Sequence, residues 1–192
     1  MSTADDQLAV TGRRVREHVL RESRRANVGH IGSALSVADV IAALYGGILR
    51  IASPDDPDRD RFVLSKGHAA LALFAALELR GWLPDGELAT YCGDDSLLGV
   101  HPESELRGID FSTGSLGHGL AIAAGSALAA RKSGSRRRVF ALLSDAELNE
   151  GSTWEAVMFA AQHRLANLYV FVDSNGQQAL GFTRDVMAID NA

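Results

Sequence analysis

Two short apolar runs, each followed by oxygen-bearing side chains, constrain the fold of this chain more than any other feature of its sequence. The run 139–143 is followed by Ser144 and Asp145, and the run 169–172 is followed closely by Asn175. The segment between the two runs has room for one crossover helix, which is the connection that parallel strands need. Such a unit brings both strand ends to one edge of the sheet, where open α/β sheets bind ligands. One carboxylate with neutral oxygens suits Mg²⁺ or Ca²⁺ holding a phosphate, so the pattern predicts that kind of site.

Strands alternate with helices along the rest of the chain. The strands are expected at 61–64, 139–143 and 169–172, and the helices at 8–25, 36–44, 69–80, 120–131 and 152–164. This alternation predicts an α/β fold with a mostly parallel sheet and helices on both faces. Ser36 with Asp39, and Ser152 with Glu155, are expected as capping boxes. By length, residues 1–192 form one domain or a large fragment of a bigger one, and the few strands suggest that the sheet is truncated at the C-terminus.

Bulk properties exclude several classes of protein. The net charge of −5 argues against a general nucleic-acid binder, and the basic cluster at 131–138 is expected to be a solvated loop. Cys92 is the one cysteine, which excludes an internal disulfide and fits a reducing compartment. The polar N-terminus does not resemble a signal peptide, and no apolar run is long enough for a membrane span. These features predict a cytoplasmic protein.

Four of the six histidines lie in loops punctuated by glycine or proline rather than on helix faces: His30, His68, His101 and His118. Binding residues concentrate in such loops, and a neighbouring glycine allows the backbone to approach a ligand closely. Histidine suits proton transfer and hydrogen bonding to sugar hydroxyls or phosphates near neutral pH. Zinc binding is the alternative, but the long spacings and the single cysteine argue against it.

Five segments, in order along the chain, resemble one known family. They are GHIGSALSVADV, DRDRFVLSKGHAA, VHPE, STGSLGHGLAIAAG, and SDAELNEGSTWEA followed by VDSNGQQALG. From about residue 12 to 185 the chain resembles the N-terminal, diphosphate-binding part of transketolase, a thiamine diphosphate enzyme. The SLGHG and NEGSTWEA variants look most like transketolases that are split into two polypeptides.

The resemblance implies a role for each matching position. The side chains of Asp145 and Asn175 and the backbone carbonyl of Gln177 would bind Mg²⁺ or Ca²⁺. His68 would contact the cofactor diphosphate near the reacting carbon, and His30 and His101 would contact substrate hydroxyls and assist proton movements. The remaining cofactor-binding positions would be Gly114, whose backbone accepts a hydrogen bond from the aminopyrimidine, Leu116, Ser144, Ala146 and Glu150, the last at a subunit interface.

The resemblance also implies a function that needs a partner. The chain would be the diphosphate-binding subunit of a split transketolase, which moves a two-carbon ketol unit from a ketose phosphate to an aldose or related acceptor. The C-terminal subunit would bind the pyrimidine and carry the activating glutamate. Self-association would then give a heterotetramer-like assembly.

Two departures from the family pattern keep other interpretations open. Ala146 replaces the second glycine of the motif GDG, and alanine would cost roughly 1 kcal/mol or more if that position requires a positive φ. The chain also stops before the further sheet, helix and histidine that the family's domain has. One alternative is two-carbon transfer to an unusual acceptor, and the other is a non-catalytic, truncated homologue that serves as a partner subunit.

Overall fold

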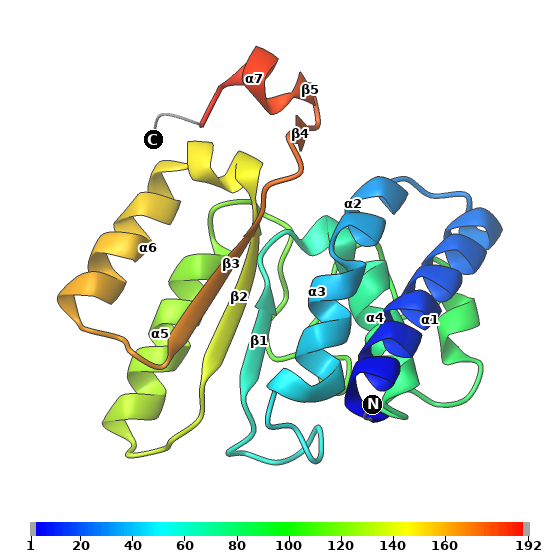
Figure 1. Ribbon diagram of the computed structural model, residues 1–192, viewed down its shortest axis with the longest axis horizontal. Coiled ribbons are helices and arrows are strands. Elements are labelled where there is room, and N and C mark those ends of the chain that lie inside the picture. The colour runs from blue at the N-terminus through cyan, green and yellow to red at the C-terminus, as the bar shows by residue number, and fades with distance from the viewer. Residues whose placement is uncertain (1–2, 190–192) are drawn as a thin grey trace. The chain divides into compact units, whose positions relative to one another are not determined.

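The computed structural model describes the backbone of residues 3–189 and the side chains of residues 12–189. The chain divides into two compact units (Figure 1). Unit 1 comprises Met1–Arg59 and Gly67–Ser112, and unit 2 comprises Asp60–Lys66 and Thr113–Ala192. The three predicted catalytic histidines belong to unit 1, whereas the predicted metal ligands belong to unit 2.

Unit 1 is built from helices around one apolar helix. That helix is α4 (Ala70–Leu79), and its side chains from Ala70 to Leu77 are all buried. The long helix α1 (Thr3–Ala26) packs against α4 and against α3 (Ala38–Ala43). No helix in the described part of the chain is both long and apolar enough to cross a membrane. The short elements of the unit are α2 (Ile31–Ser36), the π-helical turn η1 (Leu44–Ile48), and the 3-10 turns η2 (Gly67–Ala69) and η3 (Glu87–Thr90).

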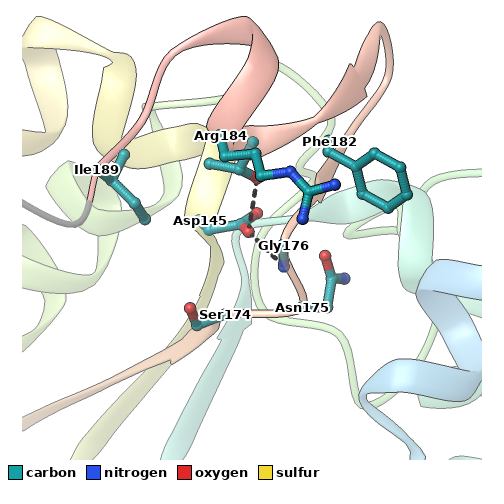
Figure 2. Close-up of a pocket in the computed structure, with 8 residues that line it drawn as sticks. Asp145, Ser174, Asn175, Gly176, Phe182, Arg184 and Ile189 are labelled. Carbon is teal, nitrogen blue, oxygen red and sulfur yellow. Dashed lines mark hydrogen bonds between the residues drawn. The ribbon is translucent and has the colours of Figure 1, made fainter.

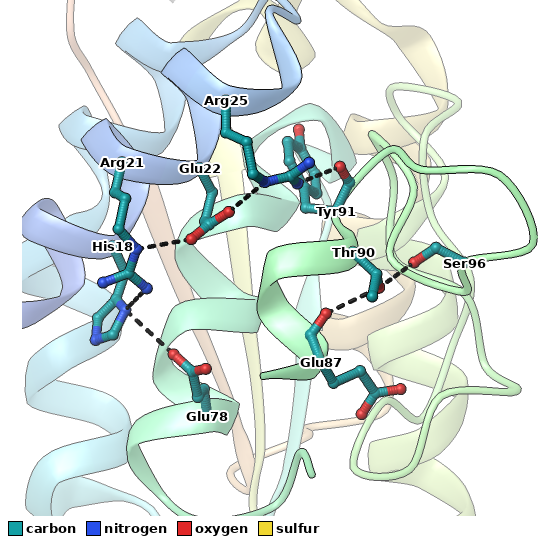
Figure 3. Close-up of polar contacts among 9 residues, drawn as sticks. All are labelled: His18, Arg21, Glu22, Arg25, Glu78, Glu87, Thr90, Tyr91 and Ser96. Atoms are coloured by element: carbon teal, nitrogen blue, oxygen red, sulfur yellow. Dashed lines mark hydrogen bonds and ion pairs between the residues drawn. The ribbon is translucent and has the colours of Figure 1, made fainter. Parts of the chain in front are cut away.

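Buried polar contacts hold the C-terminal part of α1 in unit 1 (Figure 3). The carboxylate of Glu22 accepts hydrogen bonds of 2.7 Å from Nε of Arg21 and 2.7 Å from Nε of Arg25. Arg25 also donates to the carbonyl of Tyr91 at 2.7 Å. Burial opposes ionisation of Glu22, but the hydrogen bonds from Arg25 and Arg21 outweigh it and lower the pKa of that carboxyl. The charge of Glu22 is therefore part of the packing of unit 1.

Unit 2 contains the parallel sheet. Its strands are β1 (Arg61–Leu64), β2 (Val139–Ser144) and β3 (Leu168–Asp173), in the order β1-β2-β3. Every residue of β2 is buried, because a central parallel strand is covered on both faces and needs a continuous apolar sequence. The register places Ser144 opposite Asp173, so β2 and β3 end side by side. This confirms the expected α/β class with a parallel sheet.

Small residues allow a helix to lie close to this sheet. Helix α5 (Gly119–Lys132) contacts β1, β2 and β3, and its buried residues include Ala123, Ala127 and Ala130 at helical spacing. Helix α6 (Gly151–Gln162) packs against α5. After β3 the chain forms the two-residue strands β4 (Gln177–Gln178) and β5 (Gly181–Phe182), which pair antiparallel, and the short helix α7 (Thr183–Val186).

Both expected capping boxes are wrong. The N-cap of α3 is Val37 rather than Ser36, and the N-cap of α6 is Glu150, in each case without a side-chain capping bond. The helix expected over 36–44 is interrupted, since α2 already begins at Ile31 and the segment ends in the turn η1. The capping box that does form joins Ser144 to Glu147 and opens the 3-10 turn η4 (Asp145–Asn149).

Candidate functional site

The turns that follow β2 and β3 bring Asp145 and Asn175 to one pocket (Figure 2). Asp145 is only 1 % exposed, because backbone and hydroxyl donors surround its carboxylate. Its Oδ2 accepts hydrogen bonds of 3.0 Å from the amide of Gly176 and 3.0 Å from Oγ1 of Thr183, and its Oδ1 accepts one of 2.9 Å from the amide of Ala146. The carboxylate is therefore fixed in place by the chain itself.

An ion pair between Lys66 and Asp173 is linked by a hydrogen bond to Asn175. Lys66 follows β1, is 1 % exposed, and donates from Nζ to Oδ2 of Asp173 at 2.5 Å. The same oxygen accepts a hydrogen bond of 3.1 Å from Nδ2 of Asn175. Oδ1 of Asn175 accepts the amide of Gln177 at 2.9 Å, which ties the predicted carbonyl ligand to the predicted amide ligand. The ends of all three strands thus contribute to this turn.

The pocket has a volume of about 330 Å³ and a polar lining. Arg184 is the cation of that lining, and its guanidinium lies over the ring of Phe182. The oxygen atoms of the predicted ligands suit Mg²⁺, since one carboxylate and one amide oxygen are hard ligands that leave coordination positions for phosphate and water. The described residues contain no group of three or more His, Cys, Asp or Glu placed to hold a metal ion. The pocket is lined by Asp145, Ser174, Asn175, Gly176, Phe182, Thr183, Arg184 and Ile189.

Ala146 is not strained, so the condition under which alanine would be costly at this position is not met. It lies in the turn η4, and its φ is not positive. A methyl group therefore costs no backbone strain here. The neighbouring Ser144 is held by Glu147, whose Oε2 accepts the amide of Ser144 at 2.9 Å.

The glycine-rich loop that contains Gly114 and Leu116 is anchored in unit 2. Oγ1 of Thr113 donates to the carbonyl of Leu64 at 2.7 Å, and Oγ of Ser152 donates to the carbonyl of Gly117 at 2.9 Å. Gly117 has φ +81°, and an added Cβ would lie 2.7 Å from Cβ of Glu150. Glycine is therefore required at Gly117, and this close approach puts the predicted interface residue Glu150 beside the loop.

The three predicted catalytic histidines of unit 1 lie in loops or turns, and one of them has an unusual backbone conformation. His30 is the N-cap of α2 and has φ 69°, a left-handed conformation that is uncommon outside glycine. Its ring centroid lies 5.3 Å from that of His68 in the turn η2, so the structure brings these two predicted residues together. His101 lies half-buried in a loop of the same unit.

Sequence reasoning missed four residues that organise the site: Lys66, Glu147, Asp173 and Thr183. Asp173 ends β3 and Lys66 stands two residues after β1, and these positions near strand ends were the available signal for both. Glu147 stands three residues after Ser144 and so completes a capping-box pattern that could have been recognised. Thr183 carries no local signal, because its contact with Asp145 forms only when the chain folds back after β3.

Comparison with known proteins identifies the family. The family model described as transketolase, thiamine diphosphate binding domain, matches residues 7–192 and so spans both units. The chain belongs to this family, as the five motifs predicted.

Two relatives and one solved structure illustrate the match. An apulose-4-phosphate transketolase subunit from Actinobacillus succinogenes is 42 % identical over 84 % of this chain and 60 % of the relative. The 6-deoxy-6-sulfo-D-fructose transketolase subunit SqwG of a Clostridium species is 40 % identical over 92 % of this chain and 65 % of the relative. The crystal structure of transketolase from Campylobacter jejuni matches with a TM-score of 0.86 at 30 % identity, over 99 % of this chain and 31 % of that one. The chain thus spans less than two thirds of each of these three proteins.

Proposed function

We propose that this chain is the diphosphate-binding subunit of a split, thiamine diphosphate-dependent transketolase, and that residues 1–192 act together as its diphosphate-binding domain. The observation that carries the proposal is the pocket at the ends of β2 and β3. There a buried carboxylate, Asp145, and an amide, Asn175, share one lining and are both held by hydrogen bonds from the chain. Their place at the carboxyl ends of parallel strands is where open α/β sheets bind ligands.

The residues of the pocket fit a metal-bound diphosphate. Asp145, Asn175 and the carbonyl of Gln177 would hold Mg²⁺ or Ca²⁺, which would neutralise the diphosphate. Ser144, Ala146 and the backbone of Gly114 and Leu116 would line the rest of the cofactor. When bound, thiamine diphosphate supplies the nucleophilic carbon that cleaves a carbon–carbon bond of the ketose, while the protein binds and orients.

The histidines of unit 1 would serve the substrate. His68 would contact the diphosphate near the reacting carbon, and its neighbour His30 would bind a substrate hydroxyl and move a proton at that oxygen. His101 would act in the same way on another hydroxyl. Glu150 would face the next subunit. A left-handed backbone at His30 is expected at a functional position, because such conformations persist where the structure needs one side-chain direction.

Activity is proposed to require a partner that binds the pyrimidine ring and supplies the activating glutamate. Two relatives named as subunits of transketolases support a division of labour between polypeptides. The test is cleavage of xylulose 5-phosphate by the purified chain with thiamine diphosphate and Mg²⁺, with and without the partner polypeptide. Turnover should appear only with the partner, and robust turnover by this chain alone would contradict the proposal.

The metal assignment can be tested with a pair of aspartate variants. Asp145→Asn keeps a hydrogen-bond acceptor for Gly176 and Thr183 but removes the charge, so thiamine diphosphate affinity should fall at least about tenfold, or about 1.4 kcal/mol. Asp185→Asn is the control, because it makes the same change at a carboxylate of α7 that is 64 % exposed. Calorimetry in the presence of partner and Mg²⁺ measures both variants. Equal affinities of Asp145→Asn and wild type would rule out Asp145 as a ligand.

A second proposal concerns the sugar. The names of the two relatives refer to an apulose phosphate and to a sulfofructose, so substrate differs among similar subunits. We propose that the reconstituted enzyme transfers a ketol unit from a ketose phosphate to an aldose or related acceptor, and the alternative is transfer to an unusual acceptor. Profiling donors and acceptors with the reconstituted pair distinguishes these, because common pentose and hexose phosphates would be poor substrates only under the alternative.

We also propose that the protein is cytoplasmic and that the diphosphate-binding subunit associates with a second copy of itself. Large apolar side chains are exposed on α6 and β3, and they include Met158 at 65 %, Phe159 at 41 % and Val170 at 44 %. Exposed apolar surface of this kind is typical of surfaces covered in an assembly. We expect a second copy to cover it, giving the heterotetramer-like assembly, and light scattering of the pair against the mass of one heterodimer is the test.

A further inference from the structure

Glu147 is a charged side chain with no solvent exposure, and the role proposed for the site does not use it. Its Oε1 accepts hydrogen bonds from Oγ of Ser65 and, at 3.0 Å, from the amide of Gly117. Its Oε2 accepts the amide of Ser144 at 2.9 Å and lies 3.5 Å from Oγ of Ser144. Buried charge is costly unless hydrogen bonds compensate it, and here four donor groups converge on one carboxylate.

The donors come from three separate segments. Ser65 follows β1, Ser144 ends β2, and Gly117 belongs to the glycine-rich loop. Glu147 itself lies in η4, the turn that begins with Asp145. One carboxylate therefore links the turn that carries the metal ligand to the loop that carries Gly114 and Leu116.

The loop has little freedom to move away from this carboxylate. Gly117 also accepts a hydrogen bond from Ser152, and a Cβ added at Gly119 would lie 2.7 Å from Cα of Ser65. The loop is thus packed against the end of β1 on one side and against the start of α6 on the other. A change at Glu147 would release the bond that fixes its central amide.

We propose that Glu147 is a positioning residue. It holds the glycine-rich loop next to the turn that begins with Asp145, so that the residues binding the two ends of the cofactor keep their relative positions. The proposal rests on the function proposed above, because the loop matters only if Gly114 and Leu116 face the cofactor. Groups that orient binding residues from behind commonly affect affinity by about 10- to 100-fold without touching the ligand.

Glu147→Gln is the direct test. A glutamine has one acceptor oxygen and one donor nitrogen, so in either orientation it turns an N–H group toward the amide of Gly117 or of Ser144. We expect the Kd for thiamine diphosphate to rise about tenfold in the reconstituted complex with Mg²⁺. Glu22→Gln is the matched control, because Glu22 is also buried and hydrogen-bonded but belongs to unit 1. It should lower the Tm and leave the Kd at its wild-type value.

Ser65→Ala keeps the test decisive if Glu147→Gln does not fold. It deletes one hydrogen-bond donor to Glu147 and leaves the carboxylate bonded to Gly117 and Ser144. The Kd for thiamine diphosphate should therefore rise by about threefold, which is the size of effect expected when a single hydrogen bond is lost. Wild-type Kd values for the folded Glu147→Gln and Ser65→Ala variants, with only the Tm changed, would reduce Glu147 to a structural role and overturn the inference. A wild-type complex that does not bind thiamine diphosphate would instead refute the proposed function.

Discussion

The ion pair between Lys66 and Asp173 offers the sharpest test of how the site is supported. Lys66 is 1 % exposed and Asp173 is 12 % exposed, and Nζ lies 2.5 Å from Oδ2. Lys66→Met keeps most of the aliphatic stem and removes the charge, so packing changes little. Breaking a buried pair by removing one partner costs about 3–5 kcal/mol, because the remaining charge loses its compensation. Asp173 keeps the hydrogen bond from Asn175 and some exposure, so we expect the lower end, about 3 kcal/mol.

Urea unfolding followed by circular dichroism measures this loss directly. Arg13→Met is the matched control, because Arg13 and Glu17 form a pair whose side chains are 80 % and 55 % exposed. That variant should lose less than about 0.5 kcal/mol, since water screens exposed pairs. Adding Asp173→Asn to Lys66→Met removes the uncompensated charge and should restore at least about 1 kcal/mol. The reasoning is falsified if Lys66→Met loses no more stability than Arg13→Met.

Three further predictions concern the backbone at Ala146, the hydrogen bond of Thr183 and the burial of His18. Ala146→Gly should leave the affinity for the cofactor unchanged in calorimetry and lower the free energy of unfolding by up to about 1 kcal/mol, because the backbone of η4 already suits alanine. Tighter cofactor binding by this variant would contradict the prediction. Thr183→Val should lower the free energy of unfolding in urea by about 1 kcal/mol, because Asp145 loses a buried hydrogen-bond donor. An unchanged urea midpoint would count against that contact. Burial lowers the pKa of His18 below its ordinary value of 6.5. The unfolded chain therefore binds a proton at His18 more readily than the folded chain does, so stability should fall as the pH drops below 6.5. His18→Gln should remove that part of the pH dependence in unfolding curves between about pH 8 and pH 5, and identical slopes would refute it.

The sheet could be predicted because its sequence signal is local. The strand β1 matches the expected range 61–64, and β2 and β3 differ from expectation by one residue at their ends. Strand β2 is buried along its whole length and so needs an uninterrupted apolar run, and β3 carries a similar run although its central residues are exposed. The order β1-β2-β3 was not predicted, and it places consecutive strands side by side, as is common in parallel sheets.

The sequence could not show which of its capping-box patterns forms, because the pattern is local whereas the partners that compete for each hydroxyl come from distant segments. Ser152 has the right spacing to Glu155, yet its hydroxyl donates to Gly117, a residue from another segment. Ser144 and Glu147 have the same spacing and do form the box, although they follow a strand rather than open a long helix. The sequence shows which side chains can cap a turn, and only the folded chain decides which partner is nearer.

The same distinction explains which parts of the candidate site were foreseen. Asp145 and Asn175 stand where strands end, so the position of the strands is enough to place them at one edge. The groups that orient them come from the end of β1, from the turn η4 and from the return of the chain after β3. Two of those contacts join residues far apart in sequence, Lys66 with Asp173 and Thr183 with Asp145, whereas the amide of Ala146 is adjacent to Asp145. Ligands placed by strand ends, and supporting residues at the same ends, are therefore readable from one sequence, whereas the contact of Thr183 with Asp145 forms only in the tertiary fold.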